Sequence, residues 1–152
     1  MRFWLSKLLV IISVFSISVF AQSRKMGIGL QIGEPTGLNA RYRFAENQAI
    51  NFGIGYSLID DGFSTNGNYL IMFTKLGLNP VIPYIGPGLI IQSGKKKNVA
   101  SGLFLGPEIK AGGEFFISNS PMSIYLDLTL NAFIIPSGRM SAGIAVGFHY
   151  WI

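Results

Sequence analysis

Cysteine is absent from the 152-residue sequence, and charged residues are few, at 12%. Without cysteine the chain has no disulfide framework, no cysteine-ligated zinc, no thiol nucleophile and no lipid-anchored cysteine. An ordinary soluble domain carries about 25% charged residues. The hydrophobic share of 49% excludes an intrinsically disordered chain, which needs low hydrophobicity and high net charge. A nucleic-acid binder is disfavoured because the net charge of +5 is not gathered on a basic face.

The start of the chain has the pattern of a cleaved secretory signal. Arg2 and Lys7 precede an uncharged apolar run at 8–20, and Ala21 supplies a small residue at the expected cleavage site. The run is shorter than the roughly 20 residues that a membrane-spanning helix needs. We therefore predict a signal peptide over 1–21 and one domain over 22–152, with an uncleaved membrane anchor as the alternative.

Beyond residue 21, apolar residues recur with a period of two, which is the period of a β-strand. Within 123–134, Ile124, Leu126 and Leu128 share one face, whereas Ser123 and Asp127 share the other. No window has the period of a helix, and no stretch approaches 18 consecutive apolar residues. Eight such segments follow one another along the chain: 26–33, 38–44, 49–58, 68–76, 81–92, 102–116, 123–134 and 140–152.

The polar faces of these segments predict an inverted barrel. They are rich in glycine, serine and asparagine, and they carry charges that sum to zero. A sheet face in water carries many more charges, whereas a narrow eight-stranded lumen needs small residues and paired charges. We therefore predict an all-β fold, an eight-stranded antiparallel up-and-down transmembrane β-barrel, with an ion-pair network in its lumen. The predicted members of the network are Arg41, Arg43, Glu108, Lys110, Glu114 and Asp127.

Loop lengths predict the orientation of this barrel. The two longest links, at 59–67 and 93–101, are the third and fifth connections, and an exported chain with a periplasmic N-terminus places both outside. The even-numbered connections, such as 77–80, are expected to be tight periplasmic turns. Pro83, Pro87 and Pro107 predict bulges or strand ends, because proline removes a hydrogen bond from the ladder.

The sequence resembles the small outer-membrane β-barrels typified by the transmembrane domain of outer-membrane protein A. The resemblance covers about 26–152 and includes the alternating segments, the PYIGPG stretch at 83–88 and the last strand. In that strand Ser141, Gly143, Val146 and Phe148 are similar to the family's assembly signal, although the chain ends on Ile152 where many members end on phenylalanine. The resemblance implies a bacterial outer-membrane location, a monomer surrounded by outer-membrane lipid, and insertion by the barrel-assembly machinery.

Two other features of the sequence bear on chemistry and binding. His149 is the only histidine, and we expect it to form hydrogen bonds in the lumen; the alternative is the general base of a lipid-modifying barrel enzyme. The polar face offers too few ligands for a metal site, and we expect no cofactor. Lys95, Lys96 and Lys97 form the single charge run, expected at an extracellular loop tip, either solvated or in contact with lipopolysaccharide phosphates or a host ligand.

The sequence therefore predicts a non-enzymatic integral outer-membrane protein with a plugged lumen. Its expected role is envelope structure or surface interaction through the extracellular loops, without a nucleic-acid partner. Three alternatives remain at this point: a soluble lipocalin-like carrier, a lipid-modifying outer-membrane barrel enzyme, and a small pore. A carrier needs an empty cavity, an enzyme needs an accessible base, and a pore needs an open lumen.

Overall fold

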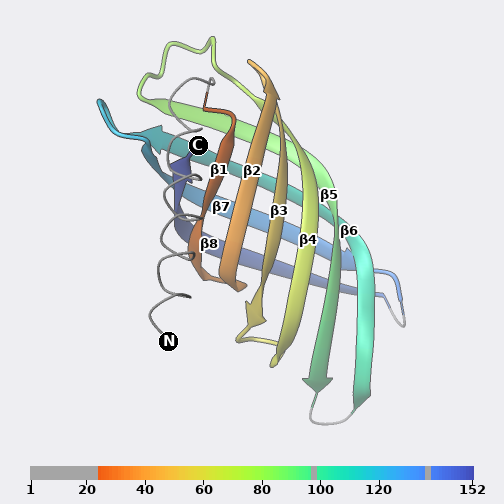
Figure 1. Ribbon diagram of the computed structural model, residues 1–152. Helices are drawn as coiled ribbons and strands as arrows, with labels where there is room; N and C mark the ends of the chain where they lie inside the picture. The colour runs from red at the N-terminus through yellow and green to blue at the C-terminus, as the bar shows by residue number, and fades with distance from the viewer. Residues whose placement is uncertain (1–23, 97–98, 136–137) are drawn as a thin grey trace, which may run out of the picture.

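The computed structural model describes residues 24–96, 99–135 and 138–152, and its eight antiparallel strands close into one barrel (Figure 1). Each strand pairs with its neighbour in sequence, and β8 pairs with β1 to close the sheet. Among the described residues no helix is long and apolar enough to cross a membrane. The predicted fold is therefore confirmed. The strands are β1 (Met26–Gly33), β2 (Thr36–Ala45), β3 (Gln48–Ser57), β4 (Gly62–Met72), β5 (Val81–Lys96), β6 (Val99–Phe116), β7 (Met122–Phe133) and β8 (Arg139–Trp151).

The two faces of the sheet differ in the way that the alternation predicts. In β7 the side chains of Ser123, Tyr125 and Asp127 point inward and are almost completely buried. The alternate residues Ile124 and Leu128 point outward, and about half of each side chain is exposed. Apolar residues therefore cover the outside of the barrel, and polar residues fill much of the inside.

The predicted bounds of the fourth strand are wrong. The strand begins at Gly62 and ends at Met72, so most of the predicted loop at 59–67 is strand and the turn before it is short. Inside this segment Ser64 and Asn66 point inward and are buried, while Phe63 points outward. Small polar residues, which are typical of loops, therefore form the lumen-facing side of this strand. For that reason the strand was predicted as a loop.

The predicted link at 93–101 is also wrong. β5 continues to Lys96 and β6 starts at Val99, which leaves only residues 97–98 between them. The β5–β6 hairpin extends beyond its neighbours: the pairing of β4 with β5 reaches Gln92, and that of β5 with β6 continues to Lys96 (Figure 1). The longest connection joins β4 to β5 instead, over 73–80. The lengths of the connections therefore do not support the predicted orientation of the barrel in the membrane. The feature that distinguishes the two ends of the barrel is the β5–β6 hairpin, which extends beyond its neighbours.

Pro83 and Pro87 lie within β5 and shift no register of its pairing with β6, whereas the β6–β7 register changes beside Pro107. Pro83 pairs with Gly113, and Pro87 pairs with Ile109, in a regular β5–β6 ladder. The one irregularity in that ladder lies near the tip, between Gly94 and Lys96. The expected bulges are therefore absent at Pro83 and Pro87 from the described β5–β6 pairing. Beside Pro87 the β4–β5 ladder is interrupted between the Asn68–Gly88 and Ile71–Ile85 pairs, because proline has no N–H to donate. At Pro107 the expected irregularity is present: the β6–β7 ladder ends at the Glu108–Asn131 pair, and the next bridge, from Leu105 to Ile135, is shifted by one residue.

Different chain segments form the two rims of the barrel, the terminal rim and the opposite rim. The terminal rim holds Lys25, whose backbone N–H donates to Ile152 O at 3.1 Å, together with the even-numbered connections at 46–47, 73–80 and 117–121. The opposite rim holds the turns at 34–35 and 58–61 and the adjoining strand ends at Lys96, Val99, Phe133 and Arg139. Because the strands are antiparallel and even in number, both chain ends of the barrel lie at one rim.

Candidate functional site

Arg41 is the centre of a polar network inside the barrel. It projects from β2 and is completely buried. Its Nη1 lies 2.8 Å from Glu114 Oε2, and its Nε donates to Asn51 Oδ1 at 3.2 Å. Its guanidinium also lies over the ring of Tyr84, 4.2 Å from the centroid, and Tyr84 donates its hydroxyl hydrogen to Asp127. Four strands thus contribute to the surroundings of one buried cation.

Lys110 is the second buried cation. It projects from β6, and its Nζ lies 3.3 Å from Asp127 Oδ2 and 4.0 Å from Glu108 Oε1. The carboxylate of Glu108 also accepts hydrogen bonds from the side-chain amides of Asn66 and Asn68 on β4, at 2.8 and 2.7 Å. Charge-assisted hydrogen bonds of this kind offset part of the cost of removing the carboxylate from water.

His149 joins the network from β8. Its Nδ1 lies 2.8 Å from Glu114 Oε1, and its Nε2 lies 2.9 Å from Asn39 Oδ1. The amide of Asn39 is oriented by Gln31, which accepts from Asn39 Nδ2 and donates its own Nε2 hydrogen to the carbonyl of Pro35. A backbone carbonyl only accepts, so it fixes the direction of every bond in this chain. Both ring nitrogens of His149 therefore face acceptors, which is the hydrogen-bonding pattern of an imidazolium.

Five of the six residues predicted for the network come together in the lumen, and Arg43 does not. Arg43 lies at the terminal rim, half-buried, with its guanidinium 5.6 Å from the ring centroid of Phe116 and 6.0 Å from that of Trp151. Its Nη2 donates to the backbone carbonyl of Glu46 at 3.3 Å. The alternation of side chains in β2 correctly predicted that Arg41 and Arg43 lie on the same face of the strand. Alternation does not predict how far along the barrel axis each residue lies.

Apolar clusters lie inside the barrel on both sides of the network. The cluster toward the terminal rim consists of Ala49, Leu70, Met72 and Tyr84. The cluster toward the opposite rim consists of Ile90, Phe104 and Phe133. An ion pair between Arg139 and Asp60 covers the second cluster, with the Arg139 guanidinium 5.4 Å from the Phe133 ring centroid. The alternation of polar and apolar residues did not predict that these apolar residues point inward. An inward-facing phenylalanine interrupts the polar pattern of the lumen-facing side.

The geometry around His149 does not match that of a nucleophilic catalytic site. Ser123 Oγ donates to Glu114 Oε1 at 2.5 Å and accepts from Trp151 Nε1 at 2.8 Å. The serine and the histidine thus both bond to one carboxylate, rather than to each other as base-activated nucleophiles do. All of these side chains are buried. Among the described residues, no group of three or more histidine, aspartate or glutamate side chains is placed to hold a metal ion.

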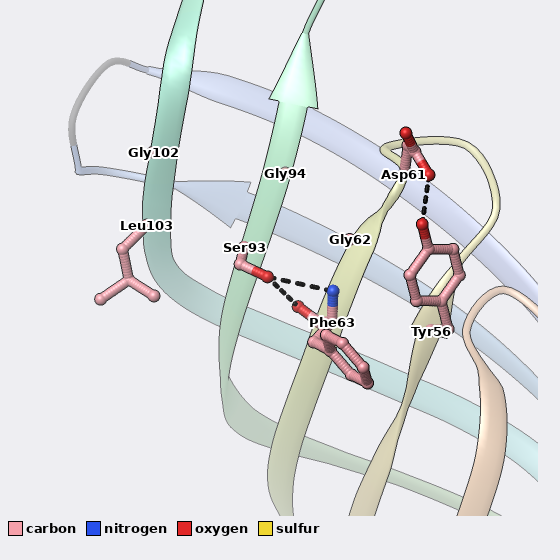
Figure 2. A pocket seen from close by; sticks show the side chains of 8 residues that line it. All are labelled: Tyr56, Asp61, Gly62, Phe63, Ser93, Gly94, Gly102 and Leu103. Atoms are coloured by element: carbon pink, nitrogen blue, oxygen red, sulfur yellow. Dashed lines mark hydrogen bonds between the residues drawn. The ribbon is translucent and has the colours of Figure 1, made fainter.

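An open cleft of about 410 Å³ lies at the opposite rim, between the β3–β4 turn and the β5–β6 hairpin (Figure 2). The rings of Tyr56 and Phe63 meet edge to face, with centroids 5.6 Å apart. Tyr56 donates its hydroxyl hydrogen to Asp61, and Ser93 Oγ accepts from the Phe63 backbone N–H at 3.0 Å. The polar groups of the cleft are thus paired with one another, and Leu103 adds an exposed apolar wall (Figure 2).

The remaining predicted site residues lie in two places. Ser141 and Gly143 of β8 lie on its inward face, while Val146 and Phe148 point outward, so the assembly-signal residues occupy both faces of one strand. The backbones of Lys95 and Lys96 end β5. Their side chains, together with Lys97 and the predicted signal peptide at 1–21, lie outside the described residues.

Comparisons with known proteins agree with this fold. No protein-family model and no curated protein matches the sequence. The chain is similar in structure to the N-terminal β-barrel domain of Pseudomonas aeruginosa OprF, with a TM-score of 0.61 and 18% identity over 84% of this chain and 98% of that one. It is also similar to Neisserial surface protein A, with a TM-score of 0.54 and 13% identity over 84% of this chain and 95% of that one. The chain shares the fold of small outer-membrane barrels.

Proposed function

We propose that this protein is an integral, non-enzymatic β-barrel of the bacterial outer membrane with a plugged lumen. The observation that carries the proposal is the inversion of the two faces. Arg41, Glu114 and Asp127 are buried inside, while Leu128 and Leu130 are 51% and 57% exposed outside. A soluble monomer rarely exposes a large contiguous apolar surface, whereas a transmembrane barrel requires an apolar band facing lipid.

The filling of the barrel supports a plugged lumen over a carrier or a pore. The ion-pair network occupies the middle of the barrel, and an apolar cluster lies on each side of it. An eight-stranded barrel leaves an interior that side chains just fill. A lipocalin-like carrier needs empty space at this position, and a pore needs a continuous water path. The burial of His149 and its bond to Glu114 likewise argue against a lipid-modifying enzyme.

A charged residue on the outer face tests membrane insertion. Leu128→Arg places a guanidinium in the middle of the proposed lipid-facing band, where it costs about 2–4 kcal/mol. We expect this variant to fold poorly into lipid vesicles, as measured by the loss of the heat-modifiable band on a gel. The matched control is Leu78→Arg in the β4–β5 link, which lies beyond the strands and is similarly exposed. Equal folding of the two variants in vesicles, or a wild-type chain that is soluble without detergent, would overturn the proposal.

Electrical recordings test the plugged lumen separately. We expect the folded wild-type protein to give no discrete conductance steps in a planar bilayer. Phe133→Ala removes one of the two phenylalanine side chains of the cluster that Arg139 covers, and it serves as the comparison variant. Conductance of the wild-type protein at the level of an open pore contradicts a filled interior.

The proposed role is envelope structure or surface interaction through the opposite rim, which we place outside the cell. Support for this orientation comes from the β5–β6 hairpin, which extends beyond its neighbours at that rim. Its tip carries the run Lys95, Lys96 and Lys97. Replacement of all three by glutamine is expected to weaken binding to lipopolysaccharide vesicles at low salt and to leave binding to uncharged vesicles unchanged. Unchanged lipopolysaccharide binding would exclude this contact.

A further inference from the structure

The side-chain charges of the described residues are distributed unequally between the two rims. The terminal rim carries Arg24, Lys25, Arg43 and Lys75 against the single carboxylate of Glu46. The opposite rim carries three carboxylates, Glu34, Asp60 and Asp61, against the single cation of Arg139, apart from the lysine run whose side chains are not described. The side chains of the terminal rim therefore carry an excess of positive charge.

Three of these cations bound one cleft. A cleft of about 320 Å³ lies beside the β2–β3 turn, and its walls include Arg24, Lys25, Arg43 and Glu46. The guanidinium of Arg43 points into the barrel, toward Phe116 and Trp151, and its Nη2 donates to the Glu46 carbonyl at 3.3 Å. Arg24 and Lys25 are exposed. In the described part of the chain, none of these three cations lies within 4.0 Å of a carboxylate.

An aromatic pair places this cleft at the edge of the apolar band. Phe44 follows Arg43 directly, points outward and contributes to the wall of the cleft. Its ring lies 6.0 Å from that of Tyr69, which is also exposed. Exposed aromatic side chains mark the two interfaces of a transmembrane barrel with its bilayer. Arg24 and Lys25 therefore lie just outside the apolar band of the barrel, at the level of the lipid phosphates.

We propose that this cleft holds the phosphate of a phospholipid headgroup from the periplasmic leaflet. Arg24 and Lys25 supply accessible cations, and Phe44 contacts the acyl chains below the headgroup. Arg43 points into the barrel and takes no part in holding the phosphate. The proposal rests on the proposed membrane insertion with the terminal rim facing the periplasm. An anionic headgroup, as in phosphatidylglycerol, fits better than phosphatidylcholine, whose choline cation would be repelled by the cluster.

The test measures lipid binding to the folded full chain in an uncharged detergent. Phosphatidylglycerol is titrated, and bound lipid is counted by native mass spectrometry. We expect wild-type protein to retain one phosphatidylglycerol in preference to phosphatidylcholine. Arg24→Gln and Lys25→Gln should each weaken that binding about 5-fold, and the double variant roughly 30-fold, as expected for the loss of one and two cations at a membrane surface.

Lys75→Gln is the matched control, because Lys75 lies at the same rim in a different cleft beside the β4–β5 link. We expect its effect to stay below about 2-fold, given that the cleft retains its full set of cations. If Lys75→Gln weakens binding as much as Lys25→Gln does, the rim attracts lipid by diffuse charge and the cleft is not a site.

A second arm separates a lipid headgroup from a free anion. Inorganic phosphate at millimolar concentration should leave the bound phosphatidylglycerol in place, since it lacks the acyl chains that Phe44 contacts. Displacement by inorganic phosphate would show a general anion site and overturn the proposal. A heat-modifiable gel shift confirms that each variant is folded. A chain that never folds in detergent contradicts the proposed function itself, whereas a folded chain without lipid preference contradicts only this inference.

Discussion

Replacement of Arg41 by methionine tests whether the interior of the barrel is dry. The side chain is completely buried, and it neutralises Glu114 through a 2.8 Å ion pair. Methionine retains much of the apolar volume but leaves two buried carboxylates, Glu114 and Asp127, to share fewer cations. Removing one partner of a buried pair costs about 3–5 kcal/mol. A pair that water reaches is worth only about 0–1 kcal/mol.

The measurement is urea unfolding of the folded protein in detergent, with the midpoint and slope determined for each variant. We expect Arg41→Met to lower the free energy of unfolding by about 3–5 kcal/mol. The double variant Arg41→Met/Glu114→Gln should recover part of this loss, because it removes the stranded charge together with its partner. Arg43→Met is the matched control, and we expect it to cost less than about 1 kcal/mol, since Arg43 has no carboxylate partner. A loss below about 1 kcal/mol for Arg41→Met, as at a solvated pair, would refute the dry lumen.

Three further predictions follow from the packing. Gly86→Ala places its Cβ 1.7 Å from a carbonyl oxygen of β4 and should destabilise the barrel by more than about 1 kcal/mol, whereas Gly67→Ala, with open space around it, should be neutral; equal effects would contradict the close strand approach. Phe133→Ala should cost about 3–5 kcal/mol in urea unfolding, and outward-facing Ile134→Ala much less in detergent; the reverse order would contradict the internal cluster. Nitrogen NMR at neutral pH should show both ring nitrogens of His149 protonated, and a single protonated nitrogen would contradict the bond directions described above.

The period of two was sufficient to predict the fold, because it reports which face each residue occupies. It placed β1, β3 and β7 within about one residue of their bounds. It failed at β4, where the inward residues Ser64 and Asn66 have the composition of a loop, while Leu70 and Met72 point inward although they are apolar. Alternation is visible only when the two faces differ in polarity, and in β4 both faces are mixed.

The members of the ion-pair network were predicted less well than the strands. Parity identified Glu108, Lys110, Glu114 and Asp127 as inward-facing, but contacts across a lumen also depend on the stagger of the strands. Glu114 on β6 meets Arg41 on β2, four strands away in the barrel, and no local pattern relates them. The offset between neighbouring strands is determined by the closed sheet as a whole, so the sequence of one segment does not predict it.

The charge count of the lumen illustrates how the structure changes a conclusion drawn from composition. The prediction that the charges in the lumen sum to zero included three cations: Arg41, Arg43 and Lys110. With Arg43 at the rim, Arg41 and Lys110 remain against three buried carboxylates, an excess of one negative charge. An uncompensated buried charge costs several kcal/mol. His149 lies at the position that removes the excess, because its two nitrogens face a carboxylate and an amide oxygen whose orientation a backbone carbonyl fixes. If nitrogen NMR shows both ring nitrogens protonated, as the hydrogen-bond directions predict, His149 is the third cation of the lumen and its charge balances the third carboxylate.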